Sequence, residues 1–448
     1  MLPFPISEAT AITYAGPPPR ETDVVVIGGG VVGVCTALFL AEAGKRVVLL
    51  EKGRIAGEQS SRNWGWIRQQ GRDPDEIPIV KEAQQLWRDL AARTNVDIGL
   101  TMGGVTYLAH SDKQMDVYRD WMSHAKEHDL GSRLLTPSEI QDLIPNIQGN
   151  HVGGIHTAND MRAEPWVAVP ALAGIAARAG ATIVENCAVR ALDMTAGRVS
   201  GVVTEAGLIK ADEVVLAGGA WSSLFLRNMG VSLPQLSVRA TVAATEPLPV
   251  VQMGGVVDKD LAFRTRVDGG YTLASGGFIE LFVGPDAFRA LPKYLAQLRK
   301  DPFGVRLNPA APKGFPDAWG TPRKWGADEQ SPFENMRVLN PDPRPKKIHD
   351  LARRFEGMFP NIGPVRLKSA WAGMIDTMPD IVPVMDRLDA LPGLTLGTGF
   401  SGHGFGIGPA AGRILADIAC GNDAGHDLNR FRFERFTDGS PMLLGPAI

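Results

Sequence analysis

The chain has 448 residues, of which 46 are Lys or Arg and 49 are Asp or Glu, so its formal net charge is −3. This length allows two or three domains and a large core, and the near balance of charge argues against a nucleic-acid partner, which usually requires a basic patch. The three cysteines, Cys35, Cys187 and Cys420, are far apart and show no C-x-x-C spacing. This argues against a disulfide framework or a zinc site and indicates a reducing compartment.

Residues 1–21 lack a basic segment followed by an apolar core, so they predict an irregular arm and not a signal peptide. The longest apolar run, at 31–43, is too short and too interrupted to span a bilayer. Together these features predict a cytoplasmic protein without a transmembrane segment.

The stretch 22–51 has the order strand, turn, helix, strand and acid. A β-branched run at 23–27 predicts a strand buried on both faces, residues 31–43 predict a helix, and residues 46–50 predict a second buried strand. Glu51 follows directly. Its carboxylate can accept hydrogen bonds from the adenosine ribose hydroxyls of a dinucleotide and disfavours a 2′-phosphate.

The turn in this stretch carries the motif G-x-G-x-x-G. Gly28 allows a tight turn, Gly30 lets a pyrophosphate approach the backbone, and Gly33 lets the helix pack close to the sheet. The amides of Val31 and Val32 begin the helix and favour negative charge. A lone motif is weak evidence, but inside a βαβ unit of about 30 residues it predicts a dinucleotide site. The alternative is a glycine-rich turn that binds no ligand.

A loop is predicted at 59–70, where small polar residues, glycine, two tryptophans and Arg68 are crowded together. Such a loop forms a ligand site or an interface, unless its tryptophans only pack inward. Beyond it, periodicity predicts helices at 79–94, 112–130, 165–180, 346–359 and 409–419, and strands at 102–110, 151–156, 181–185, 188–194, 199–204, 207–210, 212–216, 237–245, 261–266, 270–276, 366–373 and 394–398.

His124 and His128 lie four residues apart on the predicted helix 112–130, a spacing found in metal sites. No Glu follows His124 directly and no third ligand is evident, so we expect a solvated helix face and predict no metal site. The Pro- and Gly-rich segment 281–345 predicts a loop or lid region, and residues 399–406 predict a glycine-rich turn before the last helix.

Four blocks resemble the FAD-dependent D-amino-acid oxidase superfamily, which includes glycine oxidase, sarcosine oxidase and D-amino-acid dehydrogenases. They occur in the family's order between Asp23 and Ala419: GGGVVG through Glu51, SSRNWGWIRQQ, AGGAWS, and WAGMIDTMPD followed by GTGFSGHGFGIGPAAGR. The resemblance implies that the C-terminal glycine-rich turn and its helix face the pyrimidine end of the flavin. Amide donors and the positive end of a helix there suit the negative charge of a reduced flavin.

Two departures from the family pattern matter. Many relatives carry an Arg after the Trp-Ala-Gly strand, but Trp371–Asp376 contains none, which makes the pattern closer to sarcosine oxidase β-subunits. No Cys lies between Trp371 and Gly412, and no His lies near Ser61–Gly65. The resemblance therefore implies non-covalent FAD.

The implied catalytic residues are His403 and Arg68. In this interpretation Arg68 binds the substrate carboxylate; it could instead only pair with Asp73 or Asp75, and Arg264 or Arg266 could take its place. The implied substrate contacts are Arg68, Gln69, Arg264, Tyr271, Trp325 and Met374, and the implied cofactor contacts are Gly28, Gly30, Val31, Val32, Gly33, Glu51, Lys52, Ser60, Ser61, Asn63, Trp64, Gly65, Trp66, Val189, Ala217, Gly218, Trp221, Gly373, Met374, Gly402, His403, Gly404, Phe405 and Gly406.

The resemblance implies an α/β fold with a discontinuous, Rossmann-like FAD-binding domain and a β-rich substrate-binding domain. We expect the arm at 1–21, the FAD-binding domain at 22–93, 151–226 and 367–448, and the substrate-binding domain at 94–150 and 227–366. The implied reaction is hydride transfer from a small amine, D-amino acid or N-methyl amino acid to flavin N5, which gives an imine that hydrolyses.

Two further expectations complete this interpretation. Oxygen or a quinone would reoxidise the flavin, and the chain could form a homo-oligomer. Two alternatives stay open: the FAD subunit of a hetero-oligomeric amine dehydrogenase, and a flavin-binding protein without turnover.

Overall fold

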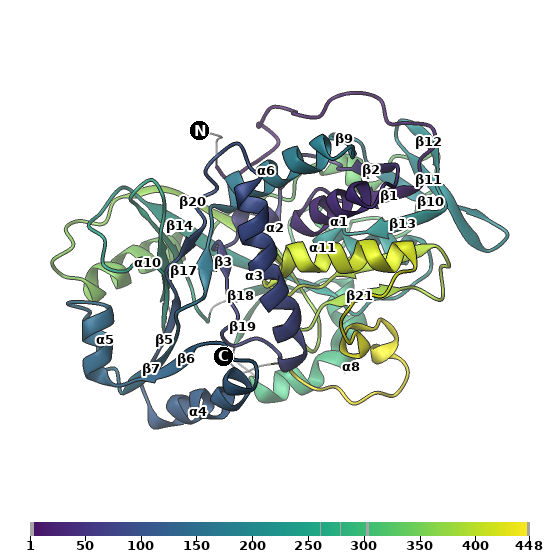
Figure 1. Ribbon diagram of the computed structural model, residues 1–448. Coiled ribbons are helices and arrows are strands. Elements are labelled where there is room, and N and C mark those ends of the chain that lie inside the picture. Colours follow the sequence, from purple (N-terminus) through teal and green to yellow (C-terminus); the bar gives the residue numbers. More distant parts are fainter. Residues whose placement is uncertain (1–3, 260, 278, 302–303, 446–448) are drawn as a thin grey trace.

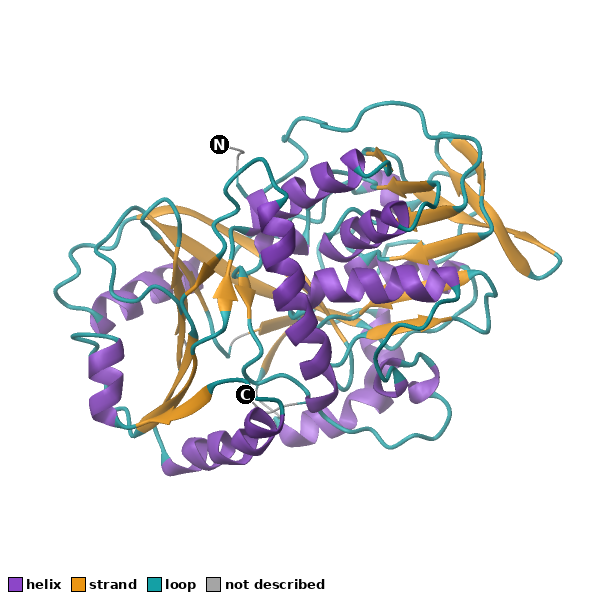
Figure 2. Ribbon diagram, in the orientation of Figure 1, coloured by secondary structure: helices purple, strands orange, loops and turns teal. Residues whose placement is uncertain are grey.

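The computed structural model describes residues 4–259, 261–277, 279–301 and 304–445 (Figure 1). Three predicted segments lie partly outside the described residues: the arm at residues 1–3, the loop region at 302–303, and the last segment of the FAD-binding domain at 446–448. Two large sheets dominate the fold, and helices cover their outer faces (Figure 2). The predicted α/β class is confirmed.

The first sheet has six strands in the order β21-β22-β13-β1-β2-β9. Strand β1 lies between β13 and β2 and is parallel to both, whereas β21 is antiparallel to its neighbour. Val25 of β1 packs into one core cluster and Val24 and Val26 into another, so the predicted burial on both faces is confirmed. The strands are β1 (Val24–Ile27), β2 (Val47–Leu50), β9 (Thr182–Val184), β13 (Glu213–Leu216), β21 (Val384–Arg387) and β22 (Leu394–Thr398).

Four helices pack in the core on one face of this sheet: α1 (Val31–Glu42), α3 (Ile77–Ala92), α6 (Pro165–Arg178) and α11 (Gly404–Cys420). Helices α1 and α11 lie side by side (Figure 1). Small residues permit this: a Cβ on Gly412 would lie 2.5 Å from the Cβ of Cys35, and a Cβ on Gly33 would lie 2.0 Å from the carbonyl oxygen of Gly28. A side chain at either position would push the helix away.

The opposite face carries the antiparallel sheet β10 (Val189–Thr195), β11 (Arg198–Thr204) and β12 (Gly207–Lys210), together with α7 (Ser222–Asn228). The strands predicted at 199–204 and 207–210 are thereby confirmed. Short 3-10 helices occur at Pro74–Glu76, Gly219–Trp221, Asn429–Phe431 and Glu434–Phe436.

The second large sheet has ten strands in the order β19-β18-β14-β17-β16-β15-β5-β7-β6, and β20 pairs with β14. Its strands are β5 (Val105–Ala109), β6 (Ser132–Leu135), β7 (Gly153–Thr157), β14 (Leu236–Thr245), β15 (Gly255–Asp258), β16 (Leu261–Thr265), β17 (Tyr271–Ala274), β18 (Ile279–Phe282), β19 (Val305–Asn308) and β20 (Leu367–Thr377). Helices α4 (Asp112–Glu127), α5 (Pro137–Leu143) and α10 (Pro345–Met358) pack beside it. A capping box starts α5, with Thr136 as its first member and Glu139 as its second.

Strands β7 and β20 lie in segments that the sequence places with the FAD-binding domain, yet both pair inside the ten-stranded sheet. Their apolar runs are equally suited to either sheet, so only the tertiary pairing decides which sheet each strand joins. The division of the remaining chain into two domains stays a prediction.

The structure corrects three predictions of local structure. Segment 281–345 contains helix α8 (Pro285–Lys300), strand β19 and helix α9 (Pro332–Asn335), so it is not a plain loop. The prolines do not prevent helices here, because Pro285 and Pro332 occupy the first turn of a helix, where a missing amide costs nothing. The predicted loop 59–70 contains α2 (Gln59–Arg62) and β3 (Trp66–Ile67); β3 pairs with β8 (Met161–Arg162), which also pairs with β4 (Thr101–Met102).

The last helix begins at Gly404 and not at residue 409. The glycines at its start have poor helix propensity, but close packing against α1 and β3 selects them. Its left-handed cap is Gly421, as expected. Among the helices of the described chain, none combines the length and apolar character that a membrane crossing requires.

Candidate functional site

One cavity of about 380 Å³ lies where the two large sheets meet. It begins at the carboxyl ends of β1, β2 and β13, which contribute Gly28, Glu51 and Ala217, and extends to Ala240 and Val242 of β14 in the ten-stranded sheet. In open parallel sheets, ligands bind at the carboxyl ends of the strands. The position is therefore that of a binding site.

The glycine-rich turn forms one wall of the cavity. Gly28 has φ +112°, which a residue with a side chain rarely adopts, so the chain turns sharply out of β1. The amide of Val31 donates to Ser60 Oγ at 2.9 Å, and a Cβ on Gly30 would lie 3.1 Å from that same oxygen. The first turn of α1 thus presents backbone to the cavity, as a pyrophosphate site requires.

Glu51 lies at the end of β2 and lines the cavity. Its Oε2 accepts from the amide of Gly29 and its Oε1 from the amide of Gly53, both at 2.7 Å. Burial raises the pKa of this carboxyl to about 7. The carboxylate is held at the position expected for a ribose acceptor.

A segment from the Pro- and Gly-rich region covers this end of the cavity. Lys52 Nζ donates to the carbonyls of Met336 and Arg337, and it also pairs with Glu58 at 2.7 Å. Glu58 in turn accepts from the indole of Trp221 at 3.0 Å. These contacts close the end of the cavity that holds the dinucleotide motif.

The other end of the cavity is formed by the C-terminal turn and the start of α11. Gly402, His403, Gly404 and Phe405 line it, and the first amides of a helix have no partner inside the helix. His403 Nδ1 lies 3.4 Å from Glu76 Oε2, and the Glu76 side chain is fully buried. The helix therefore directs donors and a positive dipole end into the cavity.

The charges around His403 set its ionisation. Burial lowers the pKa of His403 to about 4, and Arg72 acts in the same direction. Burial alone would raise the pKa of Glu76, but His403, Arg72 and Arg68 outweigh it and hold the pKa below its usual value. At neutral pH the imidazole is thus uncharged, and the two arginines are the cations that face Glu76.

Two arginines line this same end of the cavity. Arg68 donates to the carbonyl of Gln70, and its guanidinium lies 5.4 Å from the centre of the Tyr107 ring. Arg72 is buried; its Nε donates to the carbonyl of Arg68 at 3.2 Å, while its Nη1 has no hydrogen-bond partner in the described structure. Burial, followed by the nearby Arg68, lowers the pKa of Arg72 to about 9.

The alternative pairing considered for Arg68 does not form within the described residues. Asp73 and Asp75 lie 3.4 and 4.0 Å from Arg430, and neither makes an ion pair with Arg68. The Arg68 side chain is therefore available to a ligand.

Most of the residues predicted to form the site line the cavity. They are Gly28, Gly30, Val31, Val32, Glu51, Lys52, Ser60, Asn63, Trp64, Trp66, Arg68, Val189, Ala217, Gly218, Trp221, Gly373, Gly402, His403, Gly404 and Phe405. The structure brings these residues together from segments spread between 28 and 405.

Nine other predicted residues are not part of the cavity lining: Gly33, Ser61, Gly65, Gln69, Arg264, Tyr271, Trp325, Met374 and Gly406. Gly33 and Gly406 serve close packing, against Gly28 and β3 respectively. The Gln69 side chain donates to Gln84. Met374 and Trp325 pack in a core cluster.

The largest departures concern the predicted substrate contacts. Both Nη atoms of Arg264 donate to the carboxylate of Glu164 at 2.9 Å, so this buried guanidinium is already neutralised. Arg266 donates to two backbone carbonyls and pairs with Asp268. Tyr271 donates to the carbonyl of Pro249, and the Trp325 indole donates to that of Arg190. Each of these four side chains has at least one internal partner, which explains why none faces the cavity.

Sequence reasoning missed several lining residues, among them Arg72, Glu58, Arg337 and Ile279. The sequence could have indicated Arg72 as a site residue, since it lies four residues after Arg68 in the same loop. Arg337 had no such signal: it lies in the Pro- and Gly-rich segment, and its position over the cavity depends on its pair with Glu205.

The lining fits FAD. A turn without side chains at the start of α1 and the buried Glu51 suit the adenosine diphosphate half, and the start of α11 suits the ring half. At the ring end, the buried Arg72 Nη1 lacks a hydrogen-bond partner among the described residues, as expected of a group that a bound molecule would satisfy.

Comparison with known proteins agrees with this assignment. Residues 23–418 match the DAO family, described as FAD dependent oxidoreductase. The chain is similar to L-amino acid deaminase from Proteus myxofaciens, whose structure with anthranilate shares 30% identity and a TM-score of 0.91 over 96% of this chain and 97% of that chain. It is also 25% identical to sarcosine oxidase subunit beta of Arthrobacter sp, over 97% of this chain and 96% of that protein.

A third relative, human mitochondrial sarcosine dehydrogenase, is 26% identical over 96% of this chain, but the chain spans only 43% of that protein. The predicted resemblance and the predicted FAD cofactor are confirmed. The chain belongs to the family of FAD-dependent oxidoreductases.

Proposed function

We propose that the chain oxidises the C–N bond of an amino acid or an N-methyl amino acid. The observation that carries this proposal is the pair Arg68 and Arg72 on the cavity wall beside the start of α11. Guanidinium groups bind carboxylates through two parallel hydrogen bonds. The relatives support the substrate class, since their names include a deaminase of L-amino acids and a sarcosine oxidase subunit.

The residues of the chain bind and orient the substrate. Arg68 is held by the carbonyl of Gln70 and the Tyr107 ring, and Arg72 is held by the carbonyl of Arg68, so both guanidinium groups keep a fixed geometry. Trp64 and Trp66 wall the cavity beside Arg68 and lower the local dielectric, which strengthens a pair with a carboxylate.

Glu76 offsets part of the positive charge of the arginines. Its carboxylate faces His403 Nδ1 and therefore favours the tautomer that carries the proton on this nitrogen. When bound, FAD supplies the acceptor for the hydride of the C–H bond beside the substrate nitrogen. The neutral His403 adds no positive charge that would repel the substrate's ammonium group.

The binding of FAD is proposed to be non-covalent. Cys187 is a cavity-lining thiol, but its amide donates to the carbonyl of Glu51, which places it at the adenosine end, away from the flavin ring. Acid precipitation should release a yellow supernatant. Flavin that stays in the pellet would contradict non-covalent binding.

A panel of amino acids tests the function. D- and L-amino acids, N-methyl amino acids and the corresponding amines are mixed with the FAD-loaded protein under argon, and flavin bleaching is followed. We expect bleaching by at least one compound with a carboxylate. Bleaching only by amines that lack a carboxylate would contradict the proposal. Reoxidation of the bleached protein by oxygen or by a quinone then identifies the electron acceptor.

Variants of the two arginines test the binding mode. Arg68→Ala and Arg72→Ala should each lower kcat/KM for the best amino acid by about ten- to a hundredfold, because a charged hydrogen bond contributes about 1.5–3 kcal/mol. The matching amine without a carboxylate is the control and should lose little. Equal losses on both compounds would mean that the arginines only support the fold.

A second candidate is the FAD subunit of a hetero-oligomeric dehydrogenase. The observation in its favour is the end-to-end match to sarcosine oxidase β-subunits, which covers 96% of the Arthrobacter protein. Bleaching of the chain purified alone, with one peak on gel filtration, would support independent turnover. Bleaching that appears only with an added partner would support the subunit, and no bleaching under any condition would favour a flavin-binding protein without turnover. A cytoplasmic location stays a prediction from the cysteine pattern.

A further inference from the structure

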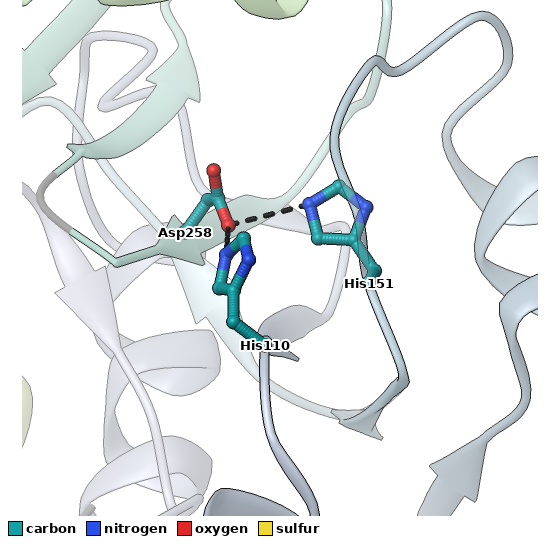
Figure 3. Close-up of side chains that lie close together, drawn as sticks. All are labelled: His110, His151 and Asp258. Atoms are coloured by element: carbon teal, nitrogen blue, oxygen red, sulfur yellow. Dashed lines mark hydrogen bonds and ion pairs between the residues drawn. The ribbon is translucent and has the colours of Figure 1, made fainter.

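Three polar side chains outside the FAD cavity meet at one end of the ten-stranded sheet. In that sheet β5 lies between β15 and β7, with Leu108 opposite Asp258 and Ala109 opposite Gly153. Asp258 is the last residue of β15, His110 follows β5 directly, and His151 lies two residues before β7. Adjacent strands thus bring together residues from three separate segments (Figure 3).

Both imidazoles are directed at one carboxylate oxygen (Figure 3). Nε2 of His110 contacts Oδ1 of Asp258, and Nε2 of His151 lies 3.3 Å from the same oxygen. One ligand atom from each of the three residues lies within 4.8 Å of the others. The arrangement is compact enough for all three atoms to contact one ion.

The histidines differ in their access to solvent. The side chain of His151 is 3% exposed, and its Nε2 has no hydrogen-bond partner in the described structure although it faces Asp258. His110 is 28% exposed and Asp258 is 15% exposed, so solvent reaches the group from one side. A Cβ on Gly149 would lie 2.9 Å from His151 Nε2, so a glycine leaves room beside this nitrogen.

The chemistry of these three atoms suits a cation. Both imidazole nitrogens face one carboxylate oxygen, and the buried Nε2 of His151 makes no hydrogen bond in the described structure, which is costly unless a ligand such as a cation satisfies it. Two imidazoles and a carboxylate form a ligand set used for Zn²⁺, with water in the fourth position. Hard cations such as Mg²⁺ and Ca²⁺ prefer oxygen ligands.

We propose that His110, His151 and Asp258 bind one divalent transition-metal ion, with Zn²⁺ as the best fit. None of the three residues lines the FAD cavity, so the ion takes no part in flavin chemistry. It would tie the end of β5 to the end of β15 and to the chain that enters β7. The site is therefore structural, and it differs from the sequence prediction, which considered only His124 and His128.

The test uses the FAD-loaded chain without a purification tag, treated with EDTA and passed through gel filtration. ZnCl₂ is added, unbound ions are removed, and zinc per chain is measured together with the midpoint of thermal unfolding. We expect one equivalent of zinc and a midpoint that rises with zinc. No retained zinc would overturn the proposal.

Variants locate the ion. His151→Gln and Asp258→Asn should each weaken zinc binding by at least about 100-fold, since even the loss of a group that only orients a ligand costs about 10–100-fold. His110→Gln changes the most exposed member and keeps the buried pair, so it reports on the site if the other variants fail to retain FAD. The matched control is His124→Gln with His128→Gln, in the last turn of α4 and directly after it, which should bind zinc as the unchanged chain does.

The zinc-dependent rise in the unfolding midpoint is the deciding quantity, because an ion pair without metal would also lose stability in these variants. If the rise is the same in the unchanged chain and in His110→Gln, zinc binds elsewhere and the proposal is wrong. If it disappears in the triad variants but persists in the α4 control, the ion is bound by His110, His151 and Asp258.

Discussion

The two ends of the FAD cavity are built in different ways. The end beside β1 and β2 is built around one continuous stretch, Gly28 to Glu51, which offers a ligand backbone amides and one carboxylate. The end beside α11 comes from segments far apart. Arg68, Arg72 and His403 line it, Glu76 lies next to His403, and the first amides of α11 complete it. Local geometry forms the first end, whereas tertiary packing forms the second.

This difference predicts different responses to mutation. Changes at the dinucleotide end should release FAD or disturb the fold, because the backbone itself is the ligand. Changes at the α11 end should leave FAD bound and alter the chemistry or its pH dependence, because there the ligands are side chains. The following variants test this division, from the largest expected effect to the smallest.

Gly33→Ala should have the largest effect. A Cβ there would lie 2.0 Å from the carbonyl oxygen of Gly28, so α1 must move away from β1. We expect a loss of at least about 1–3 kcal/mol in the free energy of unfolding and little FAD retained after gel filtration. The matched control is Gly174→Ala in α6, where the nearest atom lies 3.5 Å from the new Cβ. The free energy of unfolding of Gly174→Ala should rise by up to about 1 kcal/mol, since Ala is the better helix former. Full FAD occupancy in Gly33→Ala would contradict the packing argument.

Glu51→Ala should weaken FAD binding without unfolding the chain. A charged hydrogen bond to the ribose contributes about 1.5–3 kcal/mol, which corresponds to about 10- to 100-fold in the dissociation constant. The measurement is FAD titration of the deflavinated protein, followed by flavin fluorescence. Glu51→Gln keeps the shape of the side chain, so its dissociation constant for FAD should lie between those of the unchanged chain and of Glu51→Ala. An unchanged dissociation constant in Glu51→Ala would contradict a contact between Glu51 and FAD.

His403→Ala should slow flavin reduction by the best substrate about tenfold, at the low end for the loss of one polar group beside a developing charge. FAD affinity should change little, because His403 lies at the end of the cavity away from Glu51. Single-turnover reduction in a stopped-flow instrument measures the rate. A loss of FAD equal to that of Glu51→Ala would mean that the two ends do not divide the tasks as we propose.

The smallest effect is a pH dependence of stability. Burial lowers the folded-state pKa of His403 to about 4, whereas the unfolded chain titrates near 6.5. As pH falls below 6.5, His403 takes up a proton in the unfolded state but not in the folded state. The contribution of His403 to the free energy of unfolding is therefore complete above pH 6.5 and is lost progressively between pH 6.5 and pH 4. The upper limit is about 1.4 kcal/mol per pH unit. Urea unfolding at several pH values should show a shallower decline in His403→Gln, and identical slopes would contradict the burial of a neutral imidazole.

Local sequence was sufficient for the dinucleotide end. The β-branched strand, the glycines and Glu51 stand in an order that only the βαβ unit explains, and each residue acts on neighbours within about 30 positions. The C-terminal glycine turn was also found from the sequence, although the helix after it begins at Gly404, earlier than predicted. Short-range geometry leaves a readable pattern because few residues can adopt it.

The substrate end was only partly predictable. Arg68 lines the cavity, whereas Arg264 does not, because Glu164, a hundred positions away in the sequence, neutralises it. Arg72 was missed although it lies in the same loop. Whether an arginine faces a ligand or an internal acid depends on which partner the fold brings near it.

The sequence by itself determined the family, the cofactor and the central strands, since these depend on residues close together in the chain and on the spacing of glycines. The tertiary structure alone decided which arginines are free, that β7 and β20 join the ten-stranded sheet, and that His110, His151 and Asp258 meet at its end. The physical reason is the same in each case. Pairing between distant strands sets which side chains become neighbours, and no local pattern records that choice.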